Sequence, residues 1–313
     1  MLTEAPLERR VRFDRPVDLL STLTPLRHGH WDPTMRLEPA GVWRTTRTPE
    51  GPVTVHYRSG GRGTPEADLH EVTVSAWGAG AAHELDLVEQ VLGAHDDPAG
   101  FTASAHPVMA TAFHRFGVGW RVPRTGRVLE SLVPAILEQR VTGLEATRAW
   151  SRLVREFGER APGPAGLWLA PDGAGWARVP SWAWHRAGVD PGRARTIVRA
   201  ASRSAALERL SQLSPADAVA TLTMLPGVGD WTAAEVAVRA WGHPDAVSFG
   251  DFHLAAFVCW ALTGQRGGTD AEMATLLVPW AGQRARAVRM LELDCPRPPA
   301  RGPRATVTDH RRH

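Results

Sequence analysis

Two segments with helical spacing are separated by only six residues, the last of them a predicted N-cap, and this short connection strongly limits the possible folds. Residues 215–224 (PADAVATLTM) place apolar side chains three and four positions apart, and Ser214 precedes them as a predicted N-cap. Residues 231–241 (WTAAEVAVRAW) have the same spacing, with Asp230 as the predicted N-cap. Two helices joined by residues 225–229 must fold back on each other as a hairpin.

The glycines of this connection, Gly227 and Gly229, are expected to supply positive φ angles where a side chain would clash. The hairpin also leaves backbone N–H groups free at the start of the second helix, where the helix dipole favours an anion. A DNA phosphate is the natural anion for such a site. An ordinary corner between two helices would carry no ligand, and the glycine pair alone does not choose between the two interpretations.

A lone acid, Asp251, follows twenty residues after Trp231 in the stretch VSFGDFHL. A carboxylate beside a sugar can stabilise the positive charge that develops when an N-glycosidic bond breaks, and it can orient or deprotonate water. Because an apolar helix follows Asp251, its position is set by backbone rather than by a flexible loop. The same placement is typical of a simple N-cap, so this stretch alone leaves both roles open.

The combination of hairpin and acid resembles the helix-hairpin-helix DNA glycosylase superfamily, most nearly its 3-methyladenine DNA glycosylase II type. The family motif LPGxGxWTA is matched by Leu225, Pro226, Gly227, Gly229, Trp231, Thr232 and Ala233. The resemblance implies that Asp251 is the catalytic aspartate and that Gly227, Gly229 and Thr232 contact DNA. It covers about residues 105–295, and the first hundred residues resemble, more weakly, the N-terminal α/β domain of that subfamily.

Two further segments resemble the family. In VPAILEQRVTGLEA, Gln139 matches a glutamine that reaches into the DNA, and PWAGQRARAVRM at 279–290 resembles a proline-aromatic-arginine stretch on the last core helix. An enzyme that acts on a base in a duplex must flip the nucleotide out and fill the gap. Arg140 stands where the family often has an apolar residue, so it is either part of the wedge or a solvated surface residue.

Aromatic side chains are expected to line the base pocket, and the candidates are Trp182, Trp184 and Trp231. The only tyrosine, Tyr57, lies in the N-terminal part, which excludes tyrosine stacking in the pocket. Four residues after Trp231, where related glycosylases often carry an aromatic residue, the chain has Glu235, either a pocket acid or a helix-surface residue. A tryptophan-lined pocket favours cationic bases, which predicts excision of alkylated purines.

All 36 basic residues are arginine, a bias that a GC-rich coding sequence alone would produce. Bifunctional glycosylases attack the sugar with an amine, so a chain without lysine is predicted to be monofunctional. The formal net charge of +3 does not by itself indicate nucleic-acid binding, which requires a local arginine face.

No metal or cofactor is predicted. The two cysteines, Cys259 and Cys295, are not in metal-ligand spacing and favour a reducing cytoplasm, with Cys259 as a buried packing residue. An iron–sulfur cluster needs four cysteines. His28 and His30 lack a third ligand and are expected to be solvated.

The predicted fold class is α+β, with a small N-terminal α/β domain at 1–104, an all-α helix-hairpin-helix glycosylase domain at 105–295 and a disordered Pro/Arg-rich tail at 296–313. The first domain is expected to have the order β-α-β-β-β-α, with strands at 7–15, 42–51, 52–61 and 71–78 and helices at 17–27 and 81–93. Further helices are expected at 128–139, 144–158, 192–210, 215–224 and 231–241.

The sequence therefore predicts a hydrolase of base excision repair that binds double-stranded DNA with damaged bases. No run of eighteen apolar residues and no secretory signal is visible, so a cytoplasmic, nucleoid-associated monomer is expected. Two alternatives remain open. One is a catalytically silent helix-hairpin-helix DNA-binding protein in which Asp251 only caps a helix, and the other is a helical interaction protein whose arginines are compositional.

Overall fold

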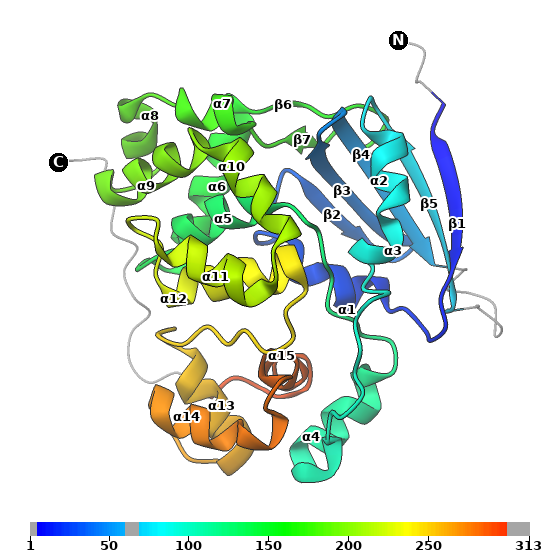
Figure 1. The fold of residues 1–313 in the computed structure, drawn as a ribbon, viewed down its shortest axis with the longest axis vertical. Helices are drawn as coiled ribbons and strands as arrows, with labels where there is room; N and C mark the ends of the chain where they lie inside the picture. The colour runs from blue at the N-terminus through cyan, green and yellow to red at the C-terminus, as the bar shows by residue number, and fades with distance from the viewer. Residues whose placement is uncertain (1–4, 60–68, 299–313) are drawn as a thin grey trace.

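Five antiparallel strands form the sheet of the N-terminal part, in the order β1-β5-β4-β3-β2 (Figure 1). The computed structural model describes residues 5–59 and 69–298. The strands are β1 (Leu7–Arg12), β2 (Met35–Glu38), β3 (Gly41–Thr48), β4 (Gly51–Ser59) and β5 (Glu71–Trp77). Strands β3 and β4 form a hairpin, which pairs Val42 with Tyr57 and Thr48 with Gly51.

Short helices cover this sheet: α1 (Leu19–Leu23), followed by the 3₁₀ turn η1 (Thr24–Leu26), and α2 (Ala81–Asp86) and α3 (Val88–Val91). The core between them includes Val11, Leu23, Val55, Tyr57, Val74 and Leu92. The predicted order is confirmed except in two places. Strand β2 was not predicted, because four residues are too few to show alternation. The helix predicted at 81–93 is broken at Leu87, which is at φ −94° and ψ 0°.

The sheet is fixed to the helical part by buried polar contacts. Thr45 Oγ1 donates to the carbonyl of Trp168 at 2.6 Å, and Thr54 Oγ1 donates to the carbonyl of Pro162 at 2.6 Å. Arg44, only 3% exposed, forms ion pairs with Glu84 of α2 and Glu130 of α5. Breaking one partner of such a buried pair would leave an uncompensated charge, so these contacts specify how the two parts dock.

The helical part begins with the 3₁₀ turn η2 (Ala103–Ala105) and α4 (Pro107–Ala112), which continues as a π turn, η3 (Phe113–Gly117). Its central elements are α5 (Val128–Glu138), α6 (Gly143–Phe157), α7 (Gly173–Ala177), α8 (Ser181–Arg186), α9 (Pro191–Ala201), α10 (Ser204–Arg209), η4 (Leu210–Gln212), α11 (Pro215–Thr223), α12 (Asp230–Val236) and η5 (Ala237–Trp241). Its last elements are α13 (Leu254–Thr263), α14 (Asp270–Leu276), η6 (Val278–Trp280) and α15 (Arg284–Asp294).

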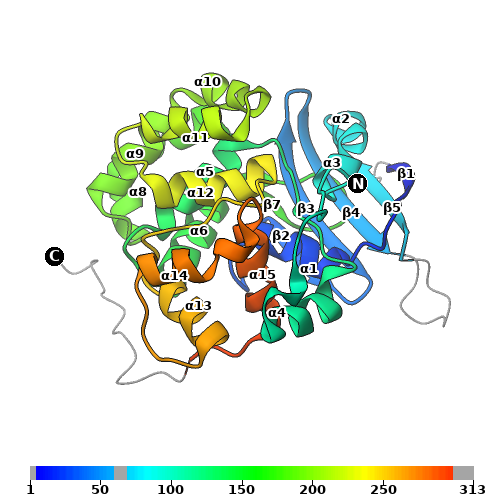
Figure 2. The ribbon, with the colours of Figure 1, turned by 60° about the horizontal axis from the view of Figure 1, so that its bottom comes forward.

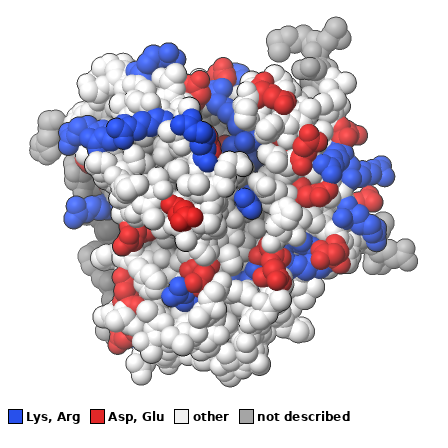
Figure 3. Space-filling model, in the orientation of Figure 1, with Lys and Arg blue, Asp and Glu red and all other residues white. Residues whose placement is uncertain are grey.

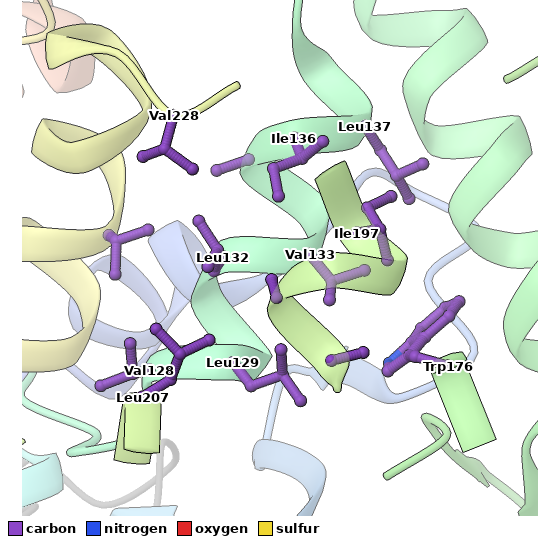
Figure 4. Packing of buried hydrophobic residues seen from close by; sticks show 14 of the residues in the cluster. Val128, Leu129, Leu132, Val133, Ile136, Leu137, Trp176, Ile197, Leu207 and Val228 are labelled. Atoms are coloured by element: carbon purple, nitrogen blue, oxygen red, sulfur yellow. The ribbon is translucent and has the colours of Figure 1, made fainter. Parts of the chain in front are cut away.

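Helix α5 runs through the centre of the larger helical core. Its residues from Val128 to Leu137 are almost all buried, and Figure 4 shows Leu132, Val133 and Ile136 pointing toward side chains from several other elements. No side chain of its own caps the start of α5. Instead the Glu208 carboxylate of α10 accepts the N–H groups of Val128 and Leu129 at 3.0 and 2.9 Å. This packing fixes the C-terminal end of α5, which leads into Gln139 and Arg140.

A second helical core forms where distant segments meet. Helix α4 packs beside α15 (Figure 2), α15 packs on α13, and α13 packs on α14. The core that these helices share includes Met109, Phe257, Met273, Trp280 and Met290. Cys259 is 5% exposed, which confirms its predicted packing role. No described helix is long and apolar enough to cross a membrane.

The expectation of an all-helical second part is wrong at one place. Two-residue strands β6 (Glu159–Arg160) and β7 (Trp168–Leu169) pair across the connection after α6. Such short strands leave no periodic pattern in a sequence. The boundary predicted at 104/105 stays a prediction, and of the predicted tail only residues 296–298 lie within the described chain.

Candidate active site

The short connection does join α11 and α12 as a hairpin, with six residues between the two helices. Ser214 caps α11 as predicted by accepting the N–H of Asp217. Helix α12 begins one residue earlier than expected, so Gly229 rather than Asp230 is its N-cap. No side chain caps this helix. Its first N–H groups are therefore left for another acceptor, as an anion site requires.

The two glycines of the hairpin differ in their surroundings. Gly227 has φ +96°, and a Cβ there would lie 2.2 Å from Thr196 Oγ1, so glycine is required. Gly229 has φ −102° and nothing within 4 Å of a Cβ built on it. The expectation that both glycines supply positive φ is wrong for Gly229, where the absence of a side chain only keeps the surface open.

Gln139 ties the end of α5 to the hairpin. Its Nε2 donates to the carbonyl of Gly227 at 3.0 Å and to Thr232 Oγ1 at 2.8 Å. Thr232, which was predicted to contact DNA, is 2% exposed and turns its hydroxyl toward Gln139. In this structure the two side chains hold the hairpin in place.

Arg140 is exposed at the predicted position of the wedge. Among the residues that the structure describes, it is the one non-glycine residue with positive φ, at 57°. A non-glycine residue in this region is strained by about 1–3 kcal/mol, and such strain concentrates at functional sites. The role of Arg140 stays a prediction.

Asp251 uses its two carboxylate oxygens differently. Oδ1 accepts the backbone N–H groups of His253 and Leu254 at 2.8 and 2.9 Å, just before α13. Oδ2 accepts Nε1–H of Trp231 on α12 at 3.3 Å. The structure thus brings Asp251 and Trp231 together, although they lie twenty residues apart in the sequence. Asp251 also makes the helix-capping interaction that was expected if it were only an N-cap.

A cavity of about 400 Å³ opens beside Asp251, between α12 with its π continuation η5, α13 and α15. Glu235 lines the cavity. Its carboxylate accepts a hydrogen bond from the Ser248 hydroxyl and forms an ion pair with Arg239 at 2.6 Å. The aromatic lining residues are Trp120 and Phe257, which the sequence analysis missed because they come from segments without a motif. Trp120 is 3% exposed, and its Nε1–H has no hydrogen-bond partner among the described residues.

Three predicted pocket residues do not line this cavity, and one of them, Trp231, contacts it only through its bond to Asp251. Trp184 is buried in the helical core, where its ring stacks on Trp176 and its Nε1 donates to the carbonyl of Val179. Trp182 is 55% exposed and packs near Phe157 at the surface. Both belong to α8, whose amphipathic pattern explains them as one buried and one exposed position.

Glu138, the last residue of α5, was not predicted as a site residue. Burial raises its pKa to about 7, with the charges of Glu235 and Asp251 acting in the same direction and Arg239 acting against them. A sequence signal existed: an acid at the C-terminal end of an apolar helix is opposed by the helix dipole.

His28 does not behave as the solvated loop residue that was expected. Its side chain packs on Trp150, with ring centroids 5.1 Å apart, and burial lowers its pKa to about 4. Nδ1 lies 4.0 Å from a Glu138 oxygen. The described residues contain no group of three or more His, Cys, Asp and Glu arranged to hold a metal ion.

Arginines form a row on the surface beside the hairpin. Arg195, Arg199 and Arg203 lie four residues apart along and just after α9, and all three are exposed. Arg199 donates to the carbonyl of Pro226 in the hairpin at 3.1 Å. Figure 3 shows a line of basic side chains over this part of the molecule, whereas elsewhere on that face basic and acidic side chains are interspersed.

The fold is that of the helix-hairpin-helix DNA glycosylases. No family model and no curated protein matches the sequence. A 3-methyladenine DNA-glycosylase from Archaeoglobus fulgidus is 18% identical with a TM-score of 0.74, covering 91% of this chain and 97% of that one. The 8-oxoguanine glycosylase/lyase of Clostridium acetobutylicum is 13% identical with a TM-score of 0.66, covering 93% and 99%. MBOgg1, bound to a low affinity DNA ligand, is 18% identical with a TM-score of 0.67, covering 92% and 95%.

Proposed function

We propose that the protein is a DNA glycosylase that binds damaged duplex DNA, flips the damaged nucleotide out and hydrolyses its N-glycosidic bond. One observation carries the proposal: the Asp251 carboxylate stands between the hairpin, through Trp231, and the 400 Å³ cavity. The hairpin would hold the backbone, the cavity would take the base, and the carboxylate would face the sugar between them.

Asp251 would stabilise the positive charge that develops on the sugar and orient the attacking water. The two backbone N–H groups and the indole N–H that it accepts fix the carboxylate before the substrate arrives, so little reorganisation is needed in the transition state. Arg140, strained and exposed at the end of α5, would enter the space that the flipped base leaves.

The reaction is proposed to stop at the abasic site. A Schiff base requires an amine, and without lysine the chain offers only its terminal amine. The expected product is an abasic strand without a nick. Trapping of a covalent protein–DNA adduct by borohydride would contradict this part of the proposal.

The preferred substrates are proposed to be purines alkylated at N3 or N7, such as 3-methyladenine and 7-methylguanine. These bases carry a positive charge and leave as neutral molecules, so they need no proton. Within the cavity Arg239 is paired with Glu235 and Arg289 with Glu292, which limits their repulsion of a cation. Aromatic faces attract such cations by about 0.5–2 kcal/mol.

The protein is proposed to work as a monomer on nucleoid DNA in the cytoplasm. All the elements that build the candidate site come from one chain: α5, the hairpin of α11 and α12, the start of α13, and α15. A second copy is therefore not needed to complete it.

A panel of otherwise identical duplexes tests the proposal. Each duplex carries one lesion among 3-methyladenine, 7-methylguanine, uracil and 8-oxoguanine, and abasic sites are revealed by alkali. Release of an alkylated purine well ahead of the other two is expected. Fastest release of uracil or 8-oxoguanine would overturn the substrate class only, and release of no base from any duplex would favour a silent DNA-binding protein.

A further inference from the structure

Three residues that line the cavity beside Asp251 carry a buried N–H group without a hydrogen-bond partner in the described chain. They are Arg27, Trp120 and Arg289, and the groups are Nε of the two arginines and Nε1 of the tryptophan. A buried donor without an acceptor is costly, and such groups are rare in folded proteins. A ligand that brings an acceptor into the cavity would remove this cost.

Trp120 is the most constrained of the three donors. It is 3% exposed, and its indole offers a single N–H group, so no second donor of the side chain can bond elsewhere. The two arginines differ, because other N–H groups of Arg27 and Arg289 bond the carbonyl of His30 and pair with Glu292. The tryptophan is therefore the donor that most needs an acceptor from outside the protein.

The contact of Trp120 with Arg286 restricts how its ring can meet a ligand. The Arg286 guanidinium lies over the ring, 5.4 Å from the centroid. A flipped base cannot stack on the face that the guanidinium covers, and a positively charged base would be repelled there. The polar edge of the ring, which carries Nε1–H, remains free of any bond within the described chain.

The acidic groups of the cavity, in contrast, are already bonded. Asp251 accepts three N–H groups, and Glu235 accepts the guanidinium of Arg239 and the hydroxyl of Ser248. An entering base therefore meets unpaired donors, while the carboxylates beside it are engaged with the protein. Such a lining favours a base that presents an acceptor and disfavours one that presents a donor at the same position.

We infer that the indole N–H of Trp120 selects purines with an oxygen at position 6, an inference that rests on the proposed glycosylase function. Every purine has ring nitrogens that accept hydrogen bonds, so these do not discriminate. Position 6 does discriminate, since it carries an acceptor oxygen in guanine and a donor amino group in adenine. An amino group facing Trp120 would place donor against donor and leave both unpaired.

This selection divides the alkylated purines. Both 7-methylguanine and 3-methyladenine carry a positive charge, so charge alone does not separate them. Only 7-methylguanine has a 6-oxo group, and it is the preferred substrate of this cavity. Trp120 contacts the base and takes no part in breaking the N-glycosidic bond, so it determines specificity rather than the chemical step.

The test is Trp120→Phe, which removes the N–H group and keeps an aromatic ring in the core. Single-turnover excision by the variant and the wild type is measured on 7-methylguanine and 3-methyladenine in the same duplex context. The variant is expected to lose about ten- to a hundredfold on 7-methylguanine and less than about threefold on 3-methyladenine. Equal losses on both lesions would show a structural role, and wild-type rates on both would show no role; either result overturns the inference.

Trp241→Phe is the matched control. Trp241 is 4% exposed and its Nε1–H also lacks a partner among the described residues, but it does not line this cavity. Any effect of this variant should be the same on both lesions, because it reports only the loss of a buried indole. A loss confined to 7-methylguanine in the control would contradict the assignment to Trp120.

A second measurement uses the wild type alone and so does not depend on the folding of a variant. Free hypoxanthine and free adenine, whose exocyclic groups differ at position 6, are added as inhibitors of 7-methylguanine release. Hypoxanthine is expected to inhibit at a concentration about tenfold lower than adenine. Equal inhibition, stronger inhibition by adenine or inhibition by neither base overturns the inference while the proposed function stands. If the wild type releases no base of the lesion panel, it is the proposed function that fails.

Discussion

Asp251 combines a capping interaction with a candidate catalytic charge in one side chain. Oδ1 accepts the N–H groups at the start of α13, while Oδ2 is held by Trp231 beside the cavity. Asparagine caps helices as well as aspartate does, so exchanging the two separates the roles.

Asp251→Asn is expected to leave the free energy of unfolding within about 1 kcal/mol of the wild-type value, because the cap is retained. Excision should slow by roughly a hundredfold to a thousandfold, or about 2.7–4 kcal/mol of barrier, because the charge facing the sugar is lost. Single-turnover excision and denaturant unfolding measure the two quantities. Excision at the wild-type rate would remove Asp251 from the mechanism.

Glu138 should make stability depend on pH. Its pKa rises from 4.5 to about 7 in the folded protein. Protonated Glu138 is favoured by the folded state, so its contribution is fully present below pH 4.5 and is lost as pH rises to about 7.

Glu138→Gln should therefore gain stability relative to the wild type as pH rises through this window. The gain is on the order of 1 kcal/mol, since the conversion of 1.36 kcal/mol per pKa unit is an upper limit for a side chain that solvent reaches. Denaturant unfolding at pH 4.5 and pH 8 gives the difference between the two proteins. A difference that does not change with pH would show that Glu138 titrates at its ordinary value.

At the scale of elements, the two glycines of the hairpin have different roles. Gly227 must be glycine for the fold, because of its φ angle and the contact with Thr196. Gly229 faces open space at the uncapped start of α12, where a phosphate oxygen would approach the N–H groups.

Gly229→Val is expected to fold normally and to bind damaged and undamaged duplex about equally less well, because a phosphate contact carries no base information. Gly227→Val should instead lose about 1–3 kcal/mol or more of stability through strain and the clash with Thr196. Thermal unfolding and DNA titration of both variants separate the two effects. A loss of affinity for one lesion only would contradict a phosphate-binding role for the hairpin.

At the scale of the molecule, the formal net charge is only +3, but arginines are concentrated on one local surface. The row of Arg195, Arg199 and Arg203 continues from the hairpin along α9. Together with the hairpin N–H groups, this surface offers contacts for several phosphates of one duplex.

The logarithm of DNA affinity should fall linearly with the logarithm of salt concentration, with a slope on the order of −3 to −6 for a handful of phosphate contacts. Arg195→Ala should reduce the slope by about 1. Arg58→Ala, on strand β4, is the control and should leave the slope unchanged. A slope near zero for the wild type would rule out the proposed binding surface.

The sequence by itself determined several local helices and the contact between Asp251 and Trp231. Helix spacing and turn residues predicted α5, α6, α9, α11 and α12, and the motif with its twenty-residue spacing predicted that Asp251 and Trp231 belong together. These signals are local, since a cap, a tight connection or a periodic apolar face is written within a few residues.

The tertiary structure alone decided which side chains share the cavity. Trp120 and Phe257 come from segments far apart in the chain, and Trp184 lies in the helical core although a tryptophan was expected to line the pocket. The raised pKa of Glu138 has the same origin, because burial and the charges of Glu235 and Asp251 exist only after α5, α12 and the start of α13 have packed together. Packing and electrostatic coupling depend on distances through space, which the order of residues does not state.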